Sequence, residues 1–473
     1  MKALKDLLDR IVQRVNINLR EFDYDVGPFI KDLVPLSQMV KFYAFYGITP
    51  HHPLNFEFRH SNLAGSYFLG KCRTNNSILY KSDVRGDELK KKGDRFKFQD
   101  FEIRLLKDEG IEIEDSYLIK TLVHNYSHDP ESLERFCINN TVSAHYANIH
   151  GSPTNGSFLG AFSTVDLTTM NDCVIGEYSY IQAGEIAHLK TDPGTVWIRN
   201  PGAFNFLYRY PLNELTRYLR CVRGKHPQGI LMDFAEAQKE AFQELFSVVD
   251  AEPLVRIPKS ASLDRFAAVS GKTRIGENVL VAERAYLKNA WLGKGSNAQE
   301  HCHIVNARLK GNNVTAHGAK IIESDLGKDV FVGFNSFLRG SPKGRLSIGK
   351  ESIIMPHTII DTKKPLKIPA GHVVWGLVTD PADLEANSVS LKDLSKVKDK
   401  LTKGNMYFEG SGAKFVSAFR SRIHHILEAN GAFYDGKKHE GHAQKNQNIS
   451  FNTIQPYPDG ALEGLYPSIL IQP

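Results

Sequence analysis

The chain has 473 residues, of which 41% are hydrophobic and 24% charged, and its formal net charge is +6. These values exclude a wholly disordered protein, and so small a charge on so long a chain is no signature of nucleic-acid binding. No run of 18 or more apolar residues occurs, so we expect no membrane span and no membrane partner.

The beginning of the chain carries apolar side chains at helical spacing, from Leu4 to Val15. This pattern predicts an amphipathic helix within an N-terminal helical segment, residues 1–50. Asp6 and Asp9 fall where a signal peptide would be continuously apolar, so we expect this segment not to be a leader.

The cysteines are few and scattered, and no two of them form a CxxC pair. A sparse, odd-numbered set is typical of reduced thiols. We therefore expect a cytoplasmic protein. The five cysteines are Cys72, Cys137, Cys173, Cys221 and Cys302.

Aliphatic residues recur five or six positions apart in residues 51–210, for example at Ile138, Ala144 and Ile149. The pattern predicts a parallel β-helix, in which three short strands form each triangular coil and an aliphatic residue marks each corner. The charged run at 87–100, DELKKKGDRFKFQD, interrupts this pattern. Such a run is typical of a solvated loop or hairpin.

Helical patterns flank the repeats. Residues 211–256 include FAEAQKEAFQELFSVV and are predicted to form a helical connector. Within residues 381–473, apolar side chains recur at i, i+3 and i+4 over 415–427. A tail rich in Gly, His, Asn and Pro follows. We predict a C-terminal helical segment that ends in an extended arm.

Residues 257–380 contain a clear seventeen-residue repeat, with blocks that begin at Ile275, Leu292, Leu309 and Leu326. Within a block the aliphatic positions lie six, six and five positions apart, which excludes a helix and predicts a second parallel β-helix. Stacked coils lie about 4.8 Å apart, so equivalent residues form ladders. The small inward positions predicted for five coils are Ala285, Cys302, Ala319, Ser336 and Thr358.

The six-residue frame resembles the left-handed β-helix of hexapeptide-repeat proteins, and this resemblance implies the left hand. The expected fold class is therefore mainly β, with a left-handed parallel β-helix in two segments and flanking α-helical segments.

Residues 60–185 contain two further motifs. A serine-isoleucine-aromatic run at 77–80 leads into Arg85-Gly86-Asp87. His145 and His150 form a histidine pair with four residues between them. Together these motifs resemble the γ-class carbonic anhydrases, which are trimeric left-handed β-helix proteins. The first histidine of that family ends a strand farther upstream. His124 fits this pattern, and His128 is a second possibility because it precedes His145 by the same seventeen positions as the repeat.

The resemblance implies a homotrimer with zinc or iron(II) bound by three histidines at a subunit interface. Their metal-bound water would attack a small electrophile such as carbon dioxide. Arg85 and Asp87 correspond to a structural ion pair at that interface. The family has a glutamine near the metal. The corresponding position in this chain is Leu118 or Lys120, which is a departure from the family pattern.

The spacing of the histidines agrees with a shared site. His145 and His150 flank one strand and are separated by more than about 10 Å of chain, so they are not expected to hold one ion within a single subunit. Each could meet the other histidine of a neighbouring subunit.

The second repeat offers a rival chemistry. His301, His303, His317 and His357 fall at outward positions near one column, with Glu300 beside them. In hexapeptide acyltransferases, which this segment resembles, one histidine deprotonates an acceptor that attacks a coenzyme A thioester. We expect His301 or His317 to be that base. The closing IPAGHVVWG at 368–376 is similar to the final turn of those enzymes.

Three functions stay open at this point: a metal-dependent lyase, an acyltransferase and a non-catalytic trimeric scaffold. We expect a small-molecule substrate and no nucleic-acid partner.

Overall fold

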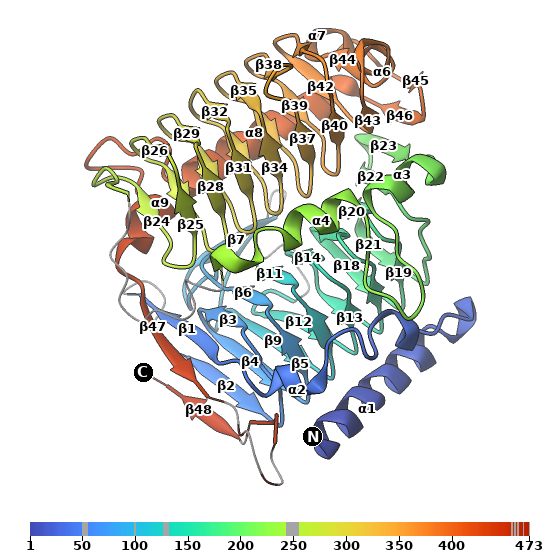
Figure 1. Ribbon diagram of the computed structural model, residues 1–473, viewed down its shortest axis with the longest axis vertical. Helices are drawn as coiled ribbons and strands as arrows, with labels where there is room; N and C mark the ends of the chain where they lie inside the picture. The colour runs from blue at the N-terminus through green and yellow to red at the C-terminus, as the bar shows by residue number, and fades with distance from the viewer. Residues whose placement is uncertain are drawn as a thin grey trace. The chain divides into compact units, whose positions relative to one another are not determined.

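The computed structural model divides the chain into two compact units (Figure 1). The first comprises Met1–Thr195, Leu219–Gln228 and Ile449–Pro473, and the second Val196–Tyr218 and Gly229–Asn448. Each unit contains its own parallel β-helix, so the expected fold class is confirmed. The boundaries of the five predicted segments stay predictions. The structure describes all residues except 50–54, 99–100, 126–131, 243–254, 456, 458–459, 461–462, 467 and 473.

The β-helix of the first unit has three faces, and strands of consecutive coils pair in parallel on each face. The strands of the first face are β20 (Tyr180–Gln182), β17 (Thr164–Asp166), β14 (Asn148–His150), β11 (Leu122–His124), β6 (Asp83–Arg85), β3 (Tyr67–Leu69) and β1 (Ala44–Ile48). Those of the second are β19 (Val174–Ile175), β16 (Phe158–Leu159), β13 (Val142–Ser143), β10 (Tyr117–Ile119) and β5 (Ile78–Tyr80). Those of the third are β21 (Gly184–Ala187), β18 (Thr168–Asn171), β15 (Thr154–Asn155), β12 (Arg135–Asn139), β9 (Gly110–Glu114), β4 (Cys72–Asn75) and β2 (Phe56–Arg59).

The predicted N-terminal helix is α1 (Lys2–Asn18), whose apolar stripe is buried. The charged insertion forms a hairpin of β7 (Arg95–Phe98) and β8 (Phe101–Arg104). The short helices that follow α1 are η1 (Arg20–Phe22), η2 (Gly27–Phe29) and α2 (Leu36–Met39).

The C-terminal arm is built into the first unit as two antiparallel strands. β47 (Ser450–Ile454) pairs with β1, and β48 (Ile469–Ile471) pairs with β2. Between them, Leu465 and Tyr466 are buried. These strands cover sheet edges that would otherwise offer unpaired backbone groups.

The β-helix of the second unit also has three faces. The strands of its first face are β24 (Ser262–Leu263), β27 (Leu280–Val281), β30 (Asn297–Ala298), β33 (Val314–Thr315), β36 (Phe331–Val332), β39 (Ile353–Ile354), β42 (His372–Val374) and the antiparallel β44 (Ser388–Ser390). Those of its second face are β25 (Ala268–Ser270), β28 (Tyr286–Lys288), β31 (His303–Val305), β34 (Lys320–Ile322), β37 (Phe337–Arg339), β40 (Ile359–Asp361) and β43 (Leu377–Val378). Those of its third face are β26 (Arg274–Ile275), β29 (Trp291–Leu292), β32 (Arg308–Leu309), β35 (Ser324–Leu326), β38 (Leu346–Ile348) and β41 (Leu366–Ile368).

Helices and further strands complete the second unit. The strands are β22 (Thr195–Asn200), β23 (Phe204–Arg209), β45 (Lys400–Lys403) and β46 (Met406–Gly410). The helices are α3 (Leu212–Tyr218), α4 (Ile230–Glu236), α6 (Pro381–Ala386), α7 (Leu391–Leu394), α8 (Gly412–Ala429), α9 (His442–Lys445) and η3 (Asn446–Asn448). The predicted helical connector supplies α3 and α4, and its residues 243–254 lie outside the described ones. None of the helices in the described part of the chain combines the length and hydropathy needed to cross a membrane.

The repeat in the sequence is the register of the second β-helix. Ile275, Leu292, Leu309 and Leu326 are consecutive partners on the third face, and all are buried. The five small inward residues are fully buried, as the frame predicts. Burial of these ladders supplies the hydrophobic stabilisation of the coil stack.

The coil corners carry residues that tolerate a left-handed backbone. Asn289, Asn306 and Glu323 follow one another in a single column with φ between 48° and 50°. Asn289 Nδ2 donates to Asn306 Oδ1 at 2.9 Å, and Asn306 Nδ2 donates to Glu323 Oε1 at 2.6 Å. Asparagine is favoured at such corners because its short polar side chain accepts positive φ.

Candidate functional site

Two of the predicted metal ligands lie side by side in the first unit. His124 ends β11 and His150 ends β14, and these two residues are partners in the parallel register. Their ring centroids are 5.0 Å apart in an edge-to-face arrangement. The sequence contains no direct signal of this pairing, because residues of uncertain loop length separate the two strands.

Charged groups surround the two rings. Arg85 is the register partner of His124 on β6, and its guanidinium lies 2.6 Å from Asp87 Oδ2. Asp87 Oδ1 lies 3.4 Å from His124 Nε2. Arg85 and Asp87 therefore form a nearly buried ion pair beside His124, and their place at a subunit interface stays a prediction.

A second carboxylate orients His150. Nδ1 of His150 is hydrogen-bonded to Asp166 Oδ1 at 2.7 Å, and the hydroxyl of Tyr180 donates to the other oxygen of Asp166. The sequence patterns did not predict Asp166 or Tyr180. The signal that could have found Asp166 is the length of this coil, which places it 16 positions after His150 and in register with it.

The remaining predicted ligands lie elsewhere. His145 is buried, and its ring centroid is 5.5 Å from that of His226. His128 lies outside the described residues. Of the two residues at the glutamine slot, Leu118 is in the core, and Lys120 directs its ammonium group to the Tyr146 hydroxyl at 3.0 Å.

A three-histidine metal site needs a third nitrogen beside His124 and His150. Among the residues described in the first unit, no further His, Cys, Asp or Glu completes such a group. The described residues of this unit therefore supply two imidazoles, and among them the fit to a metal ion is incomplete.

A histidine–carboxylate pair occurs in the second unit. His317 Nδ1 lies 2.5 Å from Glu300 Oε2, and both side chains are nearly buried. The two residues occupy equivalent corners of consecutive coils. We expected His301 to lie near His317. It is instead the residue after Glu300, one position past the corner that aligns with His317, and its φ is 58°. The seventeen-residue frame therefore places Glu300, and not His301, opposite His317.

The other two histidines of this group are also covered. His303 is 6% exposed, and its ring centroid is 5.4 Å from that of Phe234 on α4. His357 is fully buried, and its carbonyl accepts a hydrogen bond from the Tyr210 hydroxyl at 2.6 Å. Helix α4 therefore packs over the ring of His303.

Burial strongly perturbs a neighbouring pair on β31 and β34. His303 and Lys320 are register partners, and Lys320 Nζ donates to Gly318 O at 2.6 Å. Burial, together with the charge of Lys320, lowers the pKa of His303 from 6.5 to about 3. Burial lowers the pKa of Lys320 from 10.5 to about 8. His303 is therefore neutral near pH 7.

Cys302 is inert by its position. It points inward, is fully buried, and burial raises the pKa of its thiol. The sequence prediction of a small core residue is confirmed, and a nucleophilic role is excluded because the thiolate is the reactive form.

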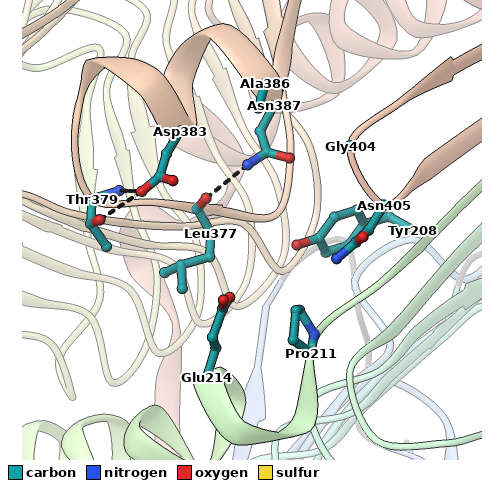
Figure 2. A pocket seen from close by; sticks show the side chains of 10 residues that line it. All are labelled: Tyr208, Pro211, Glu214, Leu377, Thr379, Asp383, Ala386, Asn387, Gly404 and Asn405. Carbon is teal, nitrogen blue, oxygen red and sulfur yellow. Dashed lines mark hydrogen bonds between the residues drawn. The ribbon is translucent and has the colours of Figure 1, made fainter.

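A cavity of about 350 Å³ lies at the end of the second β-helix (Figure 2). Asp383 accepts hydrogen bonds from Thr379 N and Oγ1 at 2.8 and 2.6 Å, while Asn387 Nδ2 donates to Leu377 O at 2.9 Å. None of the predicted site residues lines it. The lining residues are Tyr208, Pro211, Glu214, Leu377, Thr379, Asp383, Ala386, Asn387, Gly404 and Asn405.

Comparisons with known proteins agree with the architecture. A family model described as "Hexapeptide repeat including loop" matches residues 101–223. The solved structure of a "putative acetyltransferase" from Desulfovibrio desulfuricans G20 is 50% identical to the chain, with a TM-score of 0.94. The alignment covers 100% of this chain and 99% of that one. The chain belongs to the hexapeptide-repeat transferase superfamily.

Membership in the hexapeptide-repeat transferase superfamily agrees with the resemblance of residues 257–380 to the hexapeptide acyltransferases. No curated protein matches the chain. Neither the matching family nor the solved relative is described as a carbonic anhydrase, so that part of the resemblance stays a prediction.

Proposed function

We propose that this protein is an acyltransferase that moves an acyl group from a coenzyme A thioester to a hydroxyl or amine of a small molecule. The name of the full-length relative from Desulfovibrio desulfuricans supports this reading over the lyase. The observation that carries the proposal is the contact between His317 Nδ1 and Glu300 Oε2 at 2.5 Å.

The geometry of this pair suits a general base. The negative charge of the carboxylate beside Nδ1 favours a proton on that nitrogen, which would make Nε2 the basic nitrogen of the ring. As the acceptor attacks the thioester carbonyl, Nε2 of His317 would take the acceptor proton. The new C–O or C–N bond forms, the C–S bond breaks, and the proton passes to the departing thiolate.

Glu300 is the positioning residue in this scheme. It sets the tautomer and stabilises the imidazolium that forms when His317 accepts a proton. Because both side chains are nearly buried, little water screens their attraction. Of the two histidines expected to be catalytic, we assign the role to His317, because its Nδ1 contacts the Glu300 carboxylate.

Metal binding at His124 and His150 is the second candidate, and the in-register pairing of the two rings favours it. A third ligand would have to come from outside the described residues of the first unit. The resemblance to γ-class carbonic anhydrases implies a histidine of a neighbouring subunit of a homotrimer. Zinc or iron(II) bound there would supply a Lewis acid. The homotrimer and a cytoplasmic location remain part of this proposal.

The experiment that tests the acyltransferase is a binding and turnover assay on the full chain. Coenzyme A should raise the melting temperature, because a ligand that binds only the folded state stabilises it. Acetyl coenzyme A should release free thiol when amines and hydroxyl compounds are supplied as acceptors. Absence of both stabilisation and thiol release with all acceptors tested would contradict the proposal.

A further inference from the structure

The third face of the second unit differs from the other two in what covers it. On the first face Phe331 contacts Phe419 of α8, and on the second face Phe337 contacts Phe234 of α4. On the third face the outward side chains are exposed to solvent, except that Asp325 is half-buried. Its strands β26, β29 and β32 follow one another along one side of the β-helix (Figure 1).

A tryptophan stands at the centre of this exposed surface. Trp291 is 44% exposed, which is unusual for so large an apolar side chain. Its register partners one coil before and one coil after are Arg274 and Arg308. Successive coils lie about 4.8 Å apart, so an arginine side chain flanks the indole on each side. Within the described part of the chain, no ring contact or ion pair engages these three side chains.

The surrounding charge is almost entirely positive. We define the basic tryptophan patch as Trp291 with six exposed cations of the same three coils. The only acidic partner among their ion pairs in the described chain is Glu277, whose Oε2 lies 3.3 Å from Lys294. The register partner of Arg308 on the next coil is Asp325, whose Oδ2 lies 2.7 Å from Arg345 Nε, and this carboxylate ends the patch. The six cations are Lys272, Arg274, Lys288, Lys294, Arg308 and Lys310.

We propose that the basic tryptophan patch binds the nucleotide portion of a ligand, with the base stacked on Trp291 and the phosphates between Arg274 and Arg308. Base stacking on an exposed aromatic ring is a strong and sequence-tolerant interaction. Guanidinium groups match the geometry of phosphate oxygens.

The size of the patch selects a single nucleotide. Proteins that bind a nucleic-acid strand stack successive bases on several aromatic rings, whereas this patch offers one. The patch also repels an identical patch, so contact between two such surfaces is disfavoured. The chemistry fits a free nucleotide or the nucleotide end of coenzyme A. This inference does not rest on the acyltransferase proposal, because no atom of His317 takes part.

The test is calorimetric titration of the full-length protein with ADP at low salt. Trp291→Ala should weaken binding about tenfold or more, whereas Trp291→Phe should retain most of it. Arg308→Ala should weaken binding severalfold and reduce its salt dependence. Lys367→Ala is the matched control, because Lys367 is exposed in the same column, three coils beyond Arg308. It should bind ADP as the wild type does.

The source of the nucleotide follows from two further titrations. Tighter binding of coenzyme A than of ADP, lost in Trp291→Ala, would identify the acyl donor, and equal binding would identify a free nucleotide. A ten-nucleotide DNA strand that binds while ADP and coenzyme A do not would overturn the inference. So would equal ADP affinity in Trp291→Ala and Lys367→Ala, or no saturable binding of either small ligand. His317→Ala should still bind ADP, which separates this test from that of the acyltransferase.

Discussion

Glu300 and His317 occupy the same corner of consecutive coils, and Oε2 of Glu300 is 2.5 Å from Nδ1 of His317. Their separation along the chain is one full repeat, so the stacking of the β-helix alone brings the two groups together. A general base and the carboxylate that orients it are therefore fixed by the same hydrogen-bonded ladders that form the fold.

The first prediction concerns His317. His317→Ala should lower kcat for thiol release from acetyl coenzyme A by about 10²- to 10⁴-fold, because general-base assistance is worth that much. Coenzyme A should still raise the melting temperature of the variant. His372→Ala is the control, since His372 belongs to the same β-helix but hydrogen-bonds the carbonyl of Ala370. Equal turnover in both variants would contradict the assignment.

Glu300→Gln tests the positioning role within the same prediction. The amide removes the negative charge that stabilises the imidazolium but keeps the shape of the side chain. We expect kcat to fall while KM for acetyl coenzyme A stays near the wild-type value. The acidic limb of the pH–rate profile, which reports the general base, should move to lower pH because an imidazole without its carboxylate is the weaker base. An unchanged profile would mean that Glu300 is structural.

The second prediction concerns metal. If His124 and His150 bind an ion, mass spectrometry of the purified protein should find about one zinc or iron per chain. His150→Ala and His124→Ala should each lose it, because a site with three ligands depends on every one. His226→Ala should keep the metal, since His226 contacts His145 and not this pair. A metal-free wild type purified without chelators would eliminate the second candidate.

The third prediction concerns pH and His303. Its folded pKa is about 3, whereas the unfolded side chain has a pKa near 6.5. Between these values the unfolded state binds the extra proton, so stability falls as the pH falls below 6.5. The slope is at most about 1.4 kcal/mol per pH unit, which amounts to about 2 kcal/mol at pH 5. In urea titrations, His303→Phe should lose less stability than the wild type between pH 7 and pH 5.

Lys320 affects the same curve of stability against pH, but on its alkaline side. Burial lowers its folded pKa to about 8 from 10.5, so the unfolded state carries the extra proton between these values. Stability from this group therefore rises as the pH increases from 8 towards 10.5. Lys320→Met should remove that rise, because it keeps the aliphatic stem and deletes the charge. A wild-type curve that is flat over this range would show that the lysine is not desolvated.

The fourth prediction concerns the C-terminal strands. Truncation after Asn448 removes β47 and β48 and uncovers the edges of β1 and β2. It also removes Leu465 and Tyr466, whose burial is worth about 3–6 kcal/mol in total. The melting temperature of the truncated protein should fall by about 6 °C or more, since 1 kcal/mol corresponds to about 2–4 °C for a unit of this size.

The exposed edges should also make the truncated chain associate, because unpaired strand edges pair with other chains. Light scattering after gel filtration would detect this association. The control is Lys367→Ala in the full chain, which removes an exposed side chain and leaves every strand in place. A truncated protein that melts and elutes like the wild type would show that the arm is dispensable.

Much of the second β-helix could be predicted from the sequence alone. The steps of six, six and five positions placed Ile275, Leu292 and Leu309 in one ladder and turned Cys302 inward, and the structure agrees on each point. Such a pattern is local. Each coil repeats the same short strands, so the length of one repeat determines which residues of the next coil lie opposite it.

The first β-helix was harder to predict because insertions interrupt it. The pairing of His124 with His150 depends on how much of the loop between β11 and β12 belongs to the coil, and the sequence does not reveal that. Asp166 and Tyr180 were missed for a different reason: the coils there are one residue shorter than those of the second β-helix, so the seventeen-residue frame does not align these residues with His150.

The sequence by itself determined the repeat, the inward ladders, the N-terminal helix and the set of histidines from which a site could be built. Only the tertiary structure decided which of those histidines meet a carboxylate, which are covered, and where the C-terminal arm pairs. The reason is physical. A repeat fixes contacts between neighbouring coils, whereas the cover of His303 by Phe234 and the pairing of β47 with β1 join segments far apart in the chain. Contacts of that kind leave no period in the sequence.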